Sequence, residues 1–205
     1  MYRERMETLK EWKVSKTRKP LIIRGARQVG KTWLMKEFGK LYYEKCAYIN
    51  FDDNTRMNKL FDEDFDLDRI IQGLKIESGV NIEPENTLII LDEIQETPNA
   101  LKALKYFYEN ANEYHIVAAG SLLGVAMHQG TSFPVGKVNF MDLMPLSFFE
   151  FLNALGQEHL LNLLKNNEFD MISVFNNKYK DYLKLYYYIG GMPEVCLLYT
   201  SPSPR

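Results

Sequence analysis

Apolar residues along the chain follow two alternating patterns, which predict strands and helices in turn. Short continuous apolar runs predict buried strands at residues 21–23, 46–51, 87–91, 115–119 and 138–143. Apolar residues at helical spacing predict helices at 2–14, 31–42, 67–78, 99–110 and through most of 146–188. Strands that alternate with helices are typical of parallel sheets covered on both faces. We therefore expect an α/β fold, a three-layer sandwich built on a mostly parallel five-stranded sheet.

The same pattern divides the chain into a core and two flanking segments. Residues 1–19 predict an amphipathic helix and a polar connection, whereas residues 20–145 hold all the predicted strands. Residues 146–195 are helical in pattern until Gly190 and Gly191 interrupt them. Residues 62–68 contain five acids in seven positions, and we interpret them as a polar stretch that leads into the predicted helix at 67–78. The core is thus expected at 20–145, with a helical extension at 146–195.

The last ten residues, 196–205, differ from the rest of the chain in composition. They contain Ser-Pro-Ser-Pro, which is typical of a flexible linker. Their codons can also be written as one uninterrupted stretch of a sequencing adapter. We interpret 196–205 as an adapter-encoded artefact and expect the native chain to continue beyond Val195 into a further domain.

Composition is that of a globular protein. The chain has 205 residues, of which 46% are hydrophobic and 25% are charged, and this balance excludes a disordered or fibrous chain. The longest nearly apolar run, 116–127, is shorter than the roughly 20 residues of a membrane-spanning helix. Only Cys46 and Cys196 are cysteines, which excludes a disulfide scaffold. We expect a cytoplasmic protein without a membrane partner.

Positive charge is concentrated near the N-terminus, although the net charge is only −2. Residues 1–40 contain 12 lysines and arginines against 4 acids, whereas the remaining residues contain 13 against 23. Such a basic segment is typical either of a nucleic-acid surface or of a site for an anionic ligand. Glu4, Glu7 and Glu11 interrupt the basic segment, which favours the anionic ligand.

An octapeptide between the first predicted strand and the next helix has the phosphate-binding pattern G-x-x-x-x-G-K-[ST]. Its residues are Gly25, Ala26, Arg27, Gln28, Val29, Gly30, Lys31 and Thr32. The glycines let the backbone wrap around phosphate oxygens, and the helix that starts near Lys31 adds the positive end of its dipole. In this pattern the lysine contacts the β- and γ-phosphates and the threonine hydroxyl binds Mg²⁺. A glycine-rich turn with a chance Lys-Thr pair is the structural alternative.

A second candidate motif consists of two acids, Asp92 and Glu93, that directly follow the predicted strand 87–91. Ligands of open α/β sheets bind where the strands end. There, Asp92 would bind Mg²⁺ and Glu93 would polarise the water that attacks the γ-phosphate. Two solvated acids at a strand end are common by themselves, so the inference depends on the octapeptide upstream. Together the two motifs predict a site for Mg²⁺ and a nucleotide.

Three further polar residues near these motifs have two interpretations each. Ser121, at the tip of the predicted strand 115–119, would sense the γ-phosphate or cap the following helix. Arg24 and Arg27 would counter phosphate charge or pair with acids such as Glu93. The sequence leaves these alternatives open.

Several motifs in this order make the chain resemble a family of prokaryotic AAA-type P-loop ATPases. Besides the octapeptide they are Leu-Asp-Glu-Ile-Gln at 91–95, Gly-Ser-Leu-Leu-Gly at 120–124, Phe-Pro-Val-Gly-Lys-Val at 133–138, Pro-Leu-Ser-Phe-Phe-Glu-Phe-Leu at 145–152 and Gly-Gly-Met-Pro-Glu-Val at 190–195. The resemblance covers essentially all of 1–195. It implies a P-loop NTPase fold that binds ATP and Mg²⁺, followed in cis by a C-terminal domain of unknown function that is missing here. It also leaves a homo-oligomer open.

The resemblance further implies a cation that completes the site, the role of an arginine finger. No arginine occurs between Arg69 and Arg205, so Lys137 is the candidate for this catalytic role. A surface lysine at the start of a strand is one alternative, and a finger that lies beyond residue 195 is another. Because an arginine finger raises turnover roughly 10³–10⁵-fold, we expect slow intrinsic hydrolysis of ATP.

Other functions are compatible with the same two motifs. A P-loop kinase would share the phosphate loop, but it would transfer phosphate to a small molecule and would not need Glu93. A GTPase is disfavoured, because residues 58–61 and 177–180 begin with Asn-Lys but lack the aspartate of the guanine-binding Asn-Lys-x-Asp element. A module that binds nucleotide without hydrolysis, or that binds nucleic acid through residues 1–40, is the non-enzymatic alternative.

Overall fold

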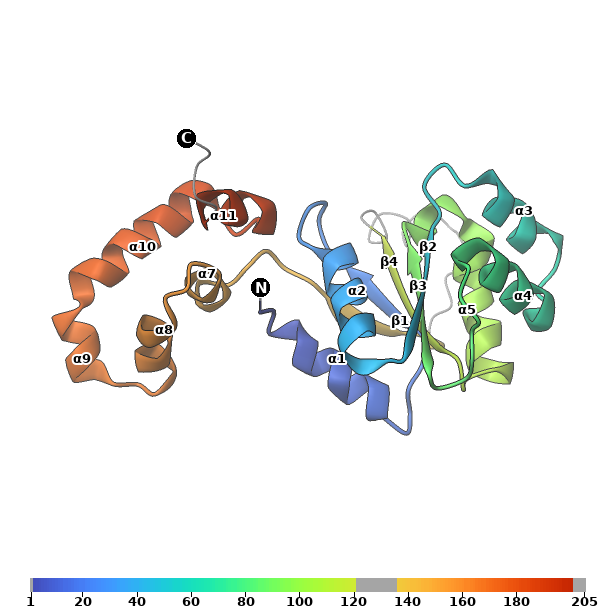
Figure 1. Cartoon of the computed structure of the whole chain (residues 1–205), viewed down its shortest axis with the longest axis horizontal. Coiled ribbons are helices and arrows are strands. Elements are labelled where there is room, and N and C mark those ends of the chain that lie inside the picture. Colours follow the sequence, from blue (N-terminus) through green and yellow to red (C-terminus); the bar gives the residue numbers. More distant parts are fainter. Residues whose placement is uncertain (1, 121–135, 201–205) are drawn as a thin grey trace. The chain divides into compact units, whose positions relative to one another are not determined.

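The computed structural model of the chain describes residues 2–120 and 136–200, which fall into two compact units (Figure 1). The sheet unit comprises the described residues of Glu7–Arg27 and Lys31–Leu143. The helical unit comprises the described residues of Met1–Met6, Gln28–Gly30 and Met144–Arg205. Each unit has its own core and is described by itself.

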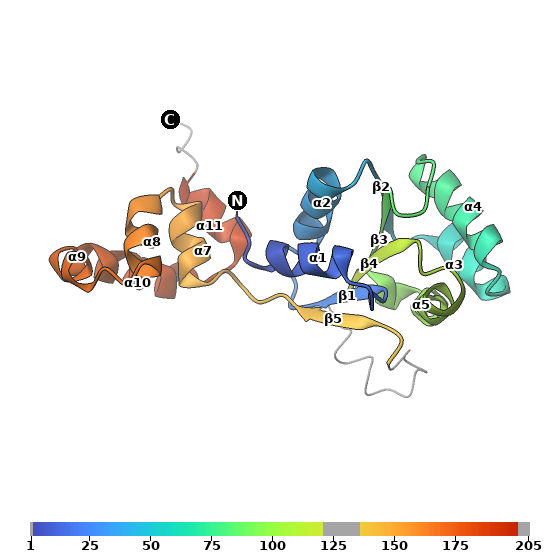
Figure 2. The same ribbon diagram turned by 90° about the horizontal axis from the view of Figure 1, so that it is seen from below.

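The sheet unit is built on parallel strands. They are β1 (Leu21–Arg24), β2 (Lys45–Asn50), β3 (Thr87–Asp92), β4 (His115–Gly120) and β5 (Asn139–Asp142). Their order is β2-β3-β4-β1-β5, and Figure 2 shows β2 and β5 at the two edges. In the register, Arg24 pairs with both Gly120 and Asp142, and Asn50 pairs with Asp92. The strands therefore end at one edge of the sheet, and the predicted five-stranded parallel sheet is confirmed.

Helices cover both faces of this sheet. They are α1 (Arg5–Val14), α2 (Lys31–Tyr42), α3 (Thr55–Glu63), α4 (Leu67–Ser78) and α5 (Pro98–Asn110). Ile89 and Leu91 of β3 belong to one buried cluster with apolar side chains of α3, α4 and α5. On the other face, Gly39 of α2 lies so close to β2 that an added Cβ would meet the Cys46 sulfur at 2.7 Å. Figure 1 shows α2 and α5 on opposite sides of the sheet, which confirms the three-layer α/β sandwich of a P-loop NTPase.

Helix α3 differs from the sequence prediction, which places a polar stretch and no helix between the strand 46–51 and the helix 67–78. Asn54 caps this helix by accepting a hydrogen bond from the backbone N–H of Met57 at 3.2 Å. Met57 and Phe61 then bury their side chains in the core of the sheet unit. The apolar residues of α3 are few but correctly spaced, and burial of this one stripe stabilises the helix.

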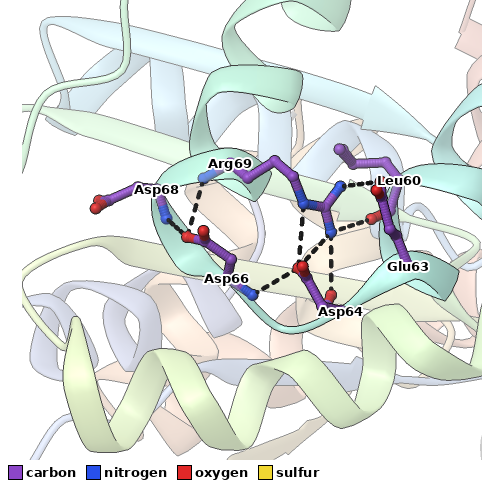
Figure 3. A network of polar contacts seen from close by, with 6 residues as sticks. All are labelled: Leu60, Glu63, Asp64, Asp66, Asp68 and Arg69. Carbon is purple, nitrogen blue, oxygen red and sulfur yellow. Dashed lines mark hydrogen bonds and ion pairs between the residues drawn. The ribbon is translucent and has the colours of Figure 1, made fainter.

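The acids after α3 form local contacts that join it to α4 (Figure 3). Arg69 pairs with Asp64 at 2.7 Å and with Glu63 at 3.3 Å, and it donates a hydrogen bond to the carbonyl of Leu60 at 2.9 Å. Asp66 accepts backbone N–H groups in the first turn of α4 and caps this helix. The backbone N–H of Asp66 and the Arg69 guanidinium together lower the pKa of Asp64.

The helical unit is built from short helices around two apolar clusters. The helices are α7 (Phe148–Ala154), α8 (Glu158–Lys165), α9 (Phe169–Val174), α10 (Asn176–Ile189) and α11 (Pro193–Thr200). Leu152, Leu160, Leu161 and Tyr179 form one cluster, and Leu146, Phe151 and Cys196 form the other. Helix α11 extends into the segment that we interpret as adapter-encoded.

A buried ion pair connects the N-terminal residues to α7 within the helical unit. Arg3 is 3% exposed, and its Nε lies 3.2 Å from Oε1 of Glu150. Its guanidinium also donates to the carbonyls of Val29 at 3.2 Å and of Met144 at 2.7 Å. Glu150 and Ser147 exchange side-chain and backbone hydrogen bonds in a capping box at the start of α7. The Glu150 carboxylate therefore serves both the ion pair and the helix cap.

Candidate functional site

The octapeptide Gly25–Thr32 connects β1 to α2, and two of its residues have a positive φ. Gly30 has φ of 90°, a conformation that costs glycine little but strains residues with a Cβ. Gln28 also has a positive φ, of 65°. The loop thus turns sharply between the end of β1 and the first turn of α2, where backbone N–H groups have no partner within the helix.

The Lys31 side chain folds back over this loop. Its Nζ donates hydrogen bonds to the carbonyl oxygens of Gly25 at 2.9 Å and of Ala26 at 2.8 Å. Burial lowers the pKa of Lys31, and the negative charges of Glu93 and Asp92 oppose that shift. The ammonium group therefore lies in the loop, within the electrostatic field of the acids that follow β3.

Asp92 joins the second motif to the first. It is the last residue of β3 and is 3% exposed. Its Oδ2 accepts a hydrogen bond from the Thr32 hydroxyl at 2.6 Å and another from the Tyr48 hydroxyl at 3.1 Å. Its Oδ1 accepts a hydrogen bond from the backbone N–H of Glu93 at 3.1 Å. The two motifs, far apart in sequence, thus meet at the carboxyl edge of the sheet.

Glu93 turns the chain sharply away from β3. Its φ of 52° and ψ of 42° lie in the left-handed region, and a short 3₁₀ helix, η1 (Ile94–Glu96), begins after it. The Gln95 amide donates a hydrogen bond to Oε2 of Glu93 at 2.6 Å. A left-handed residue that carries a side chain is uncommon and is concentrated at functional sites. The structure thus brings Gly25–Lys31, Thr32, Asp92 and Glu93 together.

The oxygens of Thr32 and Asp92 fit a magnesium ion. Mg²⁺ prefers hard oxygen ligands and is usually held by one or two carboxylates together with substrate phosphates. Within the described residues, no group of three or more His, Cys, Asp or Glu side chains could hold a metal ion. One hydroxyl and one carboxylate are nevertheless a donor set of the kind that suits a magnesium ion held together with phosphates.

Arg24 forms a specific ion pair beside the loop. Its guanidinium donates to both carboxylate oxygens of Asp142, at 2.8 and 2.9 Å, and stacks on Phe140. Arg24 and Asp142 end the neighbouring strands β1 and β5, so the pair bridges two strand ends. Of the alternatives open at Arg24, the structure contains the pair with an acid, and that acid is Asp142. Arg27 is exposed in the loop, where its charge helps to lower the pKa of Lys31.

Lys137 lies elsewhere, which corrects the expectation that it completes the site of its own chain. It precedes β5, whose first residue is Asn139, so it lies at the amino edge of the parallel sheet. Thr32 and Asp92 lie at the opposite edge. The Lys137 ammonium pairs with Oε1 of Glu109 at 2.9 Å, and this contact raises the pKa of Lys137.

Ser121 and the first residues of the 133–138 motif lie outside the described residues. The structure also adds residues that sequence reasoning missed at the site, namely Tyr48, Gln95 and Asp142. Gln95 belongs to the Leu-Asp-Glu-Ile-Gln motif at 91–95, which carries the family resemblance but gives this residue no role. The sequence signal for Tyr48 is its hydroxyl, a polar group in an otherwise apolar part of the strand.

Comparison with known proteins assigns the family. The AAA domain family matches residues 17–152, well over half of the chain. The chain belongs to the AAA domain family. It is therefore an AAA-type P-loop ATPase domain, as the resemblance implied. An uncharacterised protein of Methanocaldococcus jannaschii is 24% identical over 190 residues, a match that covers 84% of this AAA domain chain and 38% of that protein.

Solved structures share the fold of this AAA domain. A Walker-type ATPase of Pyrococcus abyssi superposes with a TM-score of 0.57 at 14% identity, covering 96% of this chain and 66% of that chain. The Drosophila ORC bound to DNA superposes with a TM-score of 0.55 at 20% identity, and the match covers 93% of this chain and 57% of that chain. The Aeropyrum pernix ORC2 protein in its ADPNP-ADP complexes superposes with a TM-score of 0.51 at 18% identity, and the match covers 78% of this chain and 52% of that chain. The chain thus spans only part of each of these proteins.

Every helix within residues 2–120 and 136–200 is too short or too polar to cross a membrane.

Proposed function

We propose that this AAA domain binds ATP together with Mg²⁺ and hydrolyses the ATP slowly. The observation that carries the proposal is the 2.6 Å hydrogen bond from Thr32 to Asp92, because it unites the phosphate-binding loop with the acids after β3. If the two motifs matched their patterns only by chance, their side chains would have no reason to contact each other. The bond occurs at the carboxyl edge of a parallel sheet, where ligands of open α/β folds bind.

Each residue of the site has a distinct role in this proposal. The backbone N–H groups of Gly25–Thr32 bind the phosphates, and Lys31 exchanges its bonds to the Gly25 and Ala26 carbonyls for the β- and γ-phosphate oxygens. Thr32 and Asp92 hold Mg²⁺, which supplies neutralisation of the charge on those oxygens. Glu93 accepts the proton of the attacking water, with its carboxylate oriented by Gln95.

The position of Lys137 supports the slow turnover in this proposal. The lysine that the sequence offers as a finger pairs with Glu109 at the amino edge of the sheet. Without a further cation at the γ-phosphate, the site lacks an interaction worth roughly 10³–10⁵ in turnover in other P-loop enzymes.

The first prediction separates binding from hydrolysis. Glu93→Gln should retain affinity for ATP but lower phosphate release about 100-fold or more, since general-base catalysis contributes roughly 10²–10⁴. Lys31→Ala should abolish binding. The measurements are binding of a fluorescent ATP analogue and release of phosphate.

Asp52→Asn is the matched control, because Asp52 is an exposed acid that follows the neighbouring strand β2. It should behave as the wild type in both measurements. Equal hydrolysis by Glu93→Gln and the wild type would contradict the role of Glu93. Fast hydrolysis that Glu93→Gln abolishes would show that the site is complete without another cation.

Two alternatives remain as outcomes of the same measurements. A P-loop kinase would consume ATP mainly when a small-molecule acceptor is added. A module that only binds nucleotide would bind the ATP analogue but release no phosphate even as the wild type. DNA binding is a weaker proposal, since Arg3, Arg18 and Arg24 of the basic segment already bind carboxylates or carbonyls of the chain. Affinity for a DNA duplex that falls steeply with salt and survives Lys31→Ala would support it.

A further inference from the structure

Tyr48 lies on the strand beside the candidate magnesium ligand. Its neighbours Ala47 and Ile49 point into the core formed with α3, α4 and α5. Because side chains alternate along a strand, Tyr48 points to the opposite face, which α2 covers. In the register Tyr48 pairs with Ile90, two residues before Asp92. A long side chain at this position can reach the end of β3 along the strand direction.

The Tyr48 hydroxyl is one of three donors that hold the Asp92 carboxylate. It donates to Oδ2 at 3.1 Å, and the Thr32 hydroxyl donates to the same oxygen at 2.6 Å. The backbone N–H of Glu93 donates to Oδ1 at 3.1 Å. A carboxylate accepts about four hydrogen bonds, so these three fix its orientation and leave acceptor capacity for another ligand.

The Tyr48 ring is itself held in place. The Lys36 ammonium on α2 lies 3.5 Å from the ring centroid, a cation–π contact on the same face of the sheet. A tyrosine hydroxyl is protonated at neutral pH, so it donates its hydrogen to the Asp92 carboxylate.

We propose that Tyr48 is a positioning residue for the magnesium–nucleotide site, acting through the Asp92 carboxylate. This inference rests on the proposed function. Mg²⁺ demands near-ideal octahedral geometry, so it binds best to a carboxylate whose orientation is already fixed. Hydrogen-bond partners behind a metal ligand typically contribute 10–100-fold to metal affinity. The Tyr48 hydroxyl acts on the Asp92 carboxylate and not on the phosphate-binding loop. The affinity for nucleotide in the absence of Mg²⁺ should therefore not depend on this hydroxyl.

The experiment uses Tyr48→Phe, which keeps the ring on Lys36 and removes only the hydroxyl. A fluorescent ATP analogue is titrated in EDTA, and Mg²⁺ is titrated at a fixed concentration of the analogue. The Mg²⁺ concentration for half-maximal binding should rise about 10-fold. Affinity in EDTA should change less than about twofold, and the melting temperature should stay within a few degrees of the wild type.

Tyr43→Phe is the matched control. Its hydroxyl is also partly buried and bonds Nδ1 of His115 at 2.7 Å, at the amino edge of the sheet. This variant should leave both titrations unchanged. An unchanged magnesium midpoint in Tyr48→Phe would overturn the inference, as would an equal loss of affinity in EDTA and in Mg²⁺. Absence of ATP binding by the wild type would instead refute the proposed function, and the inference with it.

Discussion

Glu93 combines a chemical role with an unfavourable backbone conformation. It directly follows Asp92, its φ is 52°, and its carboxylate accepts a hydrogen bond from Gln95. A residue with a Cβ loses roughly 1–2 kcal/mol in this region relative to its preferred conformation. The turn nevertheless keeps the backbone N–H of Glu93 on Asp92, which helps to orient the magnesium ligand. The strained turn thus lets two adjacent acids bond different partners, because Asp92 accepts from Thr32 and Glu93 accepts from Gln95.

This backbone conformation predicts an unusual order of stability. Glu93→Gly and Glu93→Ala both remove the carboxylate, so neither should hydrolyse ATP at more than about 1% of the wild-type rate. Only alanine retains the strain of the left-handed conformation, so Glu93→Gly should be more stable by about 1 kcal/mol. Urea unfolding of the two variants measures this difference.

The control is the same pair of substitutions at Glu37, inside α2. There the order should reverse, because glycine destabilises a helix interior by roughly 0.5–1 kcal/mol relative to alanine. The same order at both positions would contradict the role of the Glu93 backbone.

The residues of the site differ in how far the sequence could predict them. Thr32 and Asp92 each belong to a short motif that can be recognised in the sequence. Their contact could be predicted because the carboxyl ends of parallel strands lie at one edge of the sheet. Tyr48 could not be predicted, because its contact depends on the register of β2 against β3. The position of Lys137 was predictable in principle, since it precedes a strand whereas the site residues follow strands.

At the scale of elements, caps explain where the sequence pattern succeeded. Helix α4 spans Leu67–Ser78, the range that the pattern predicted, because Asp66 caps its start and Gly79 ends it with a φ of 68°. The sequence pattern does not predict α3, because most of its residues are polar and the acid-rich stretch 62–68 begins at its end, although Asn54 and two buried residues signal a short amphipathic helix. Composition was thus a poorer guide than the cap and the spacing of the apolar residues.

The start of α7 offers a test of a buried ion pair. Arg3→Met would leave the Glu150 carboxylate 5% exposed without its counter-charge. Loss of one partner of a buried pair typically costs about 3–5 kcal/mol, and we expect a loss of that size in urea unfolding. Adding Glu150→Met to Arg3→Met should recover part of this loss, because no unpaired charge then remains.

The exposed pair of Lys10 and Glu7 serves as the control. Lys10→Met should change the free energy of unfolding by less than about 1 kcal/mol. If Arg3→Met cost no more than Lys10→Met, the buried pair would contribute nothing to the stability of the helical unit.

At the scale of the whole molecule, the core of the sheet unit contains a histidine that stays neutral. His115 begins β4, is 4% exposed, and its Nδ1 bonds the Tyr43 hydroxyl. Burial, together with the positive charges of Arg18 and Lys13, lowers the pKa of His115 to about 4 from its ordinary value of 6.5. In the unfolded chain this histidine binds a proton at a higher pH than it does in the folded chain.

The stability of the protein should therefore depend on pH through His115. Well above pH 6.5 the residue is neutral in both states, and its contribution to the free energy of unfolding is constant. Between pH 6.5 and about 4 only the unfolded state gains the proton, so the free energy of unfolding should fall by on the order of 2 kcal/mol. Urea unfolding of the wild type and of His115→Asn across this range measures the difference.

The exposed His159 provides the control, since His159→Asn should keep the pH profile of the wild type. A His115→Asn profile that falls as steeply as the wild-type profile would show that other groups cause the dependence.

The aligned ends of the strands have a consequence for how the length of this chain can vary. Side chains alternate along β3, so one inserted residue between Thr87 and Asp92 would turn the acid from the α2 face toward α5. It would separate Asp92 from Thr32 and leave a carboxylate in an apolar core. Residues 79–86, which lead into the amino end of β3, carry no such constraint. Insertions and deletions among homologues should accordingly accumulate at the amino edge of the sheet and be absent from the strands that carry the site.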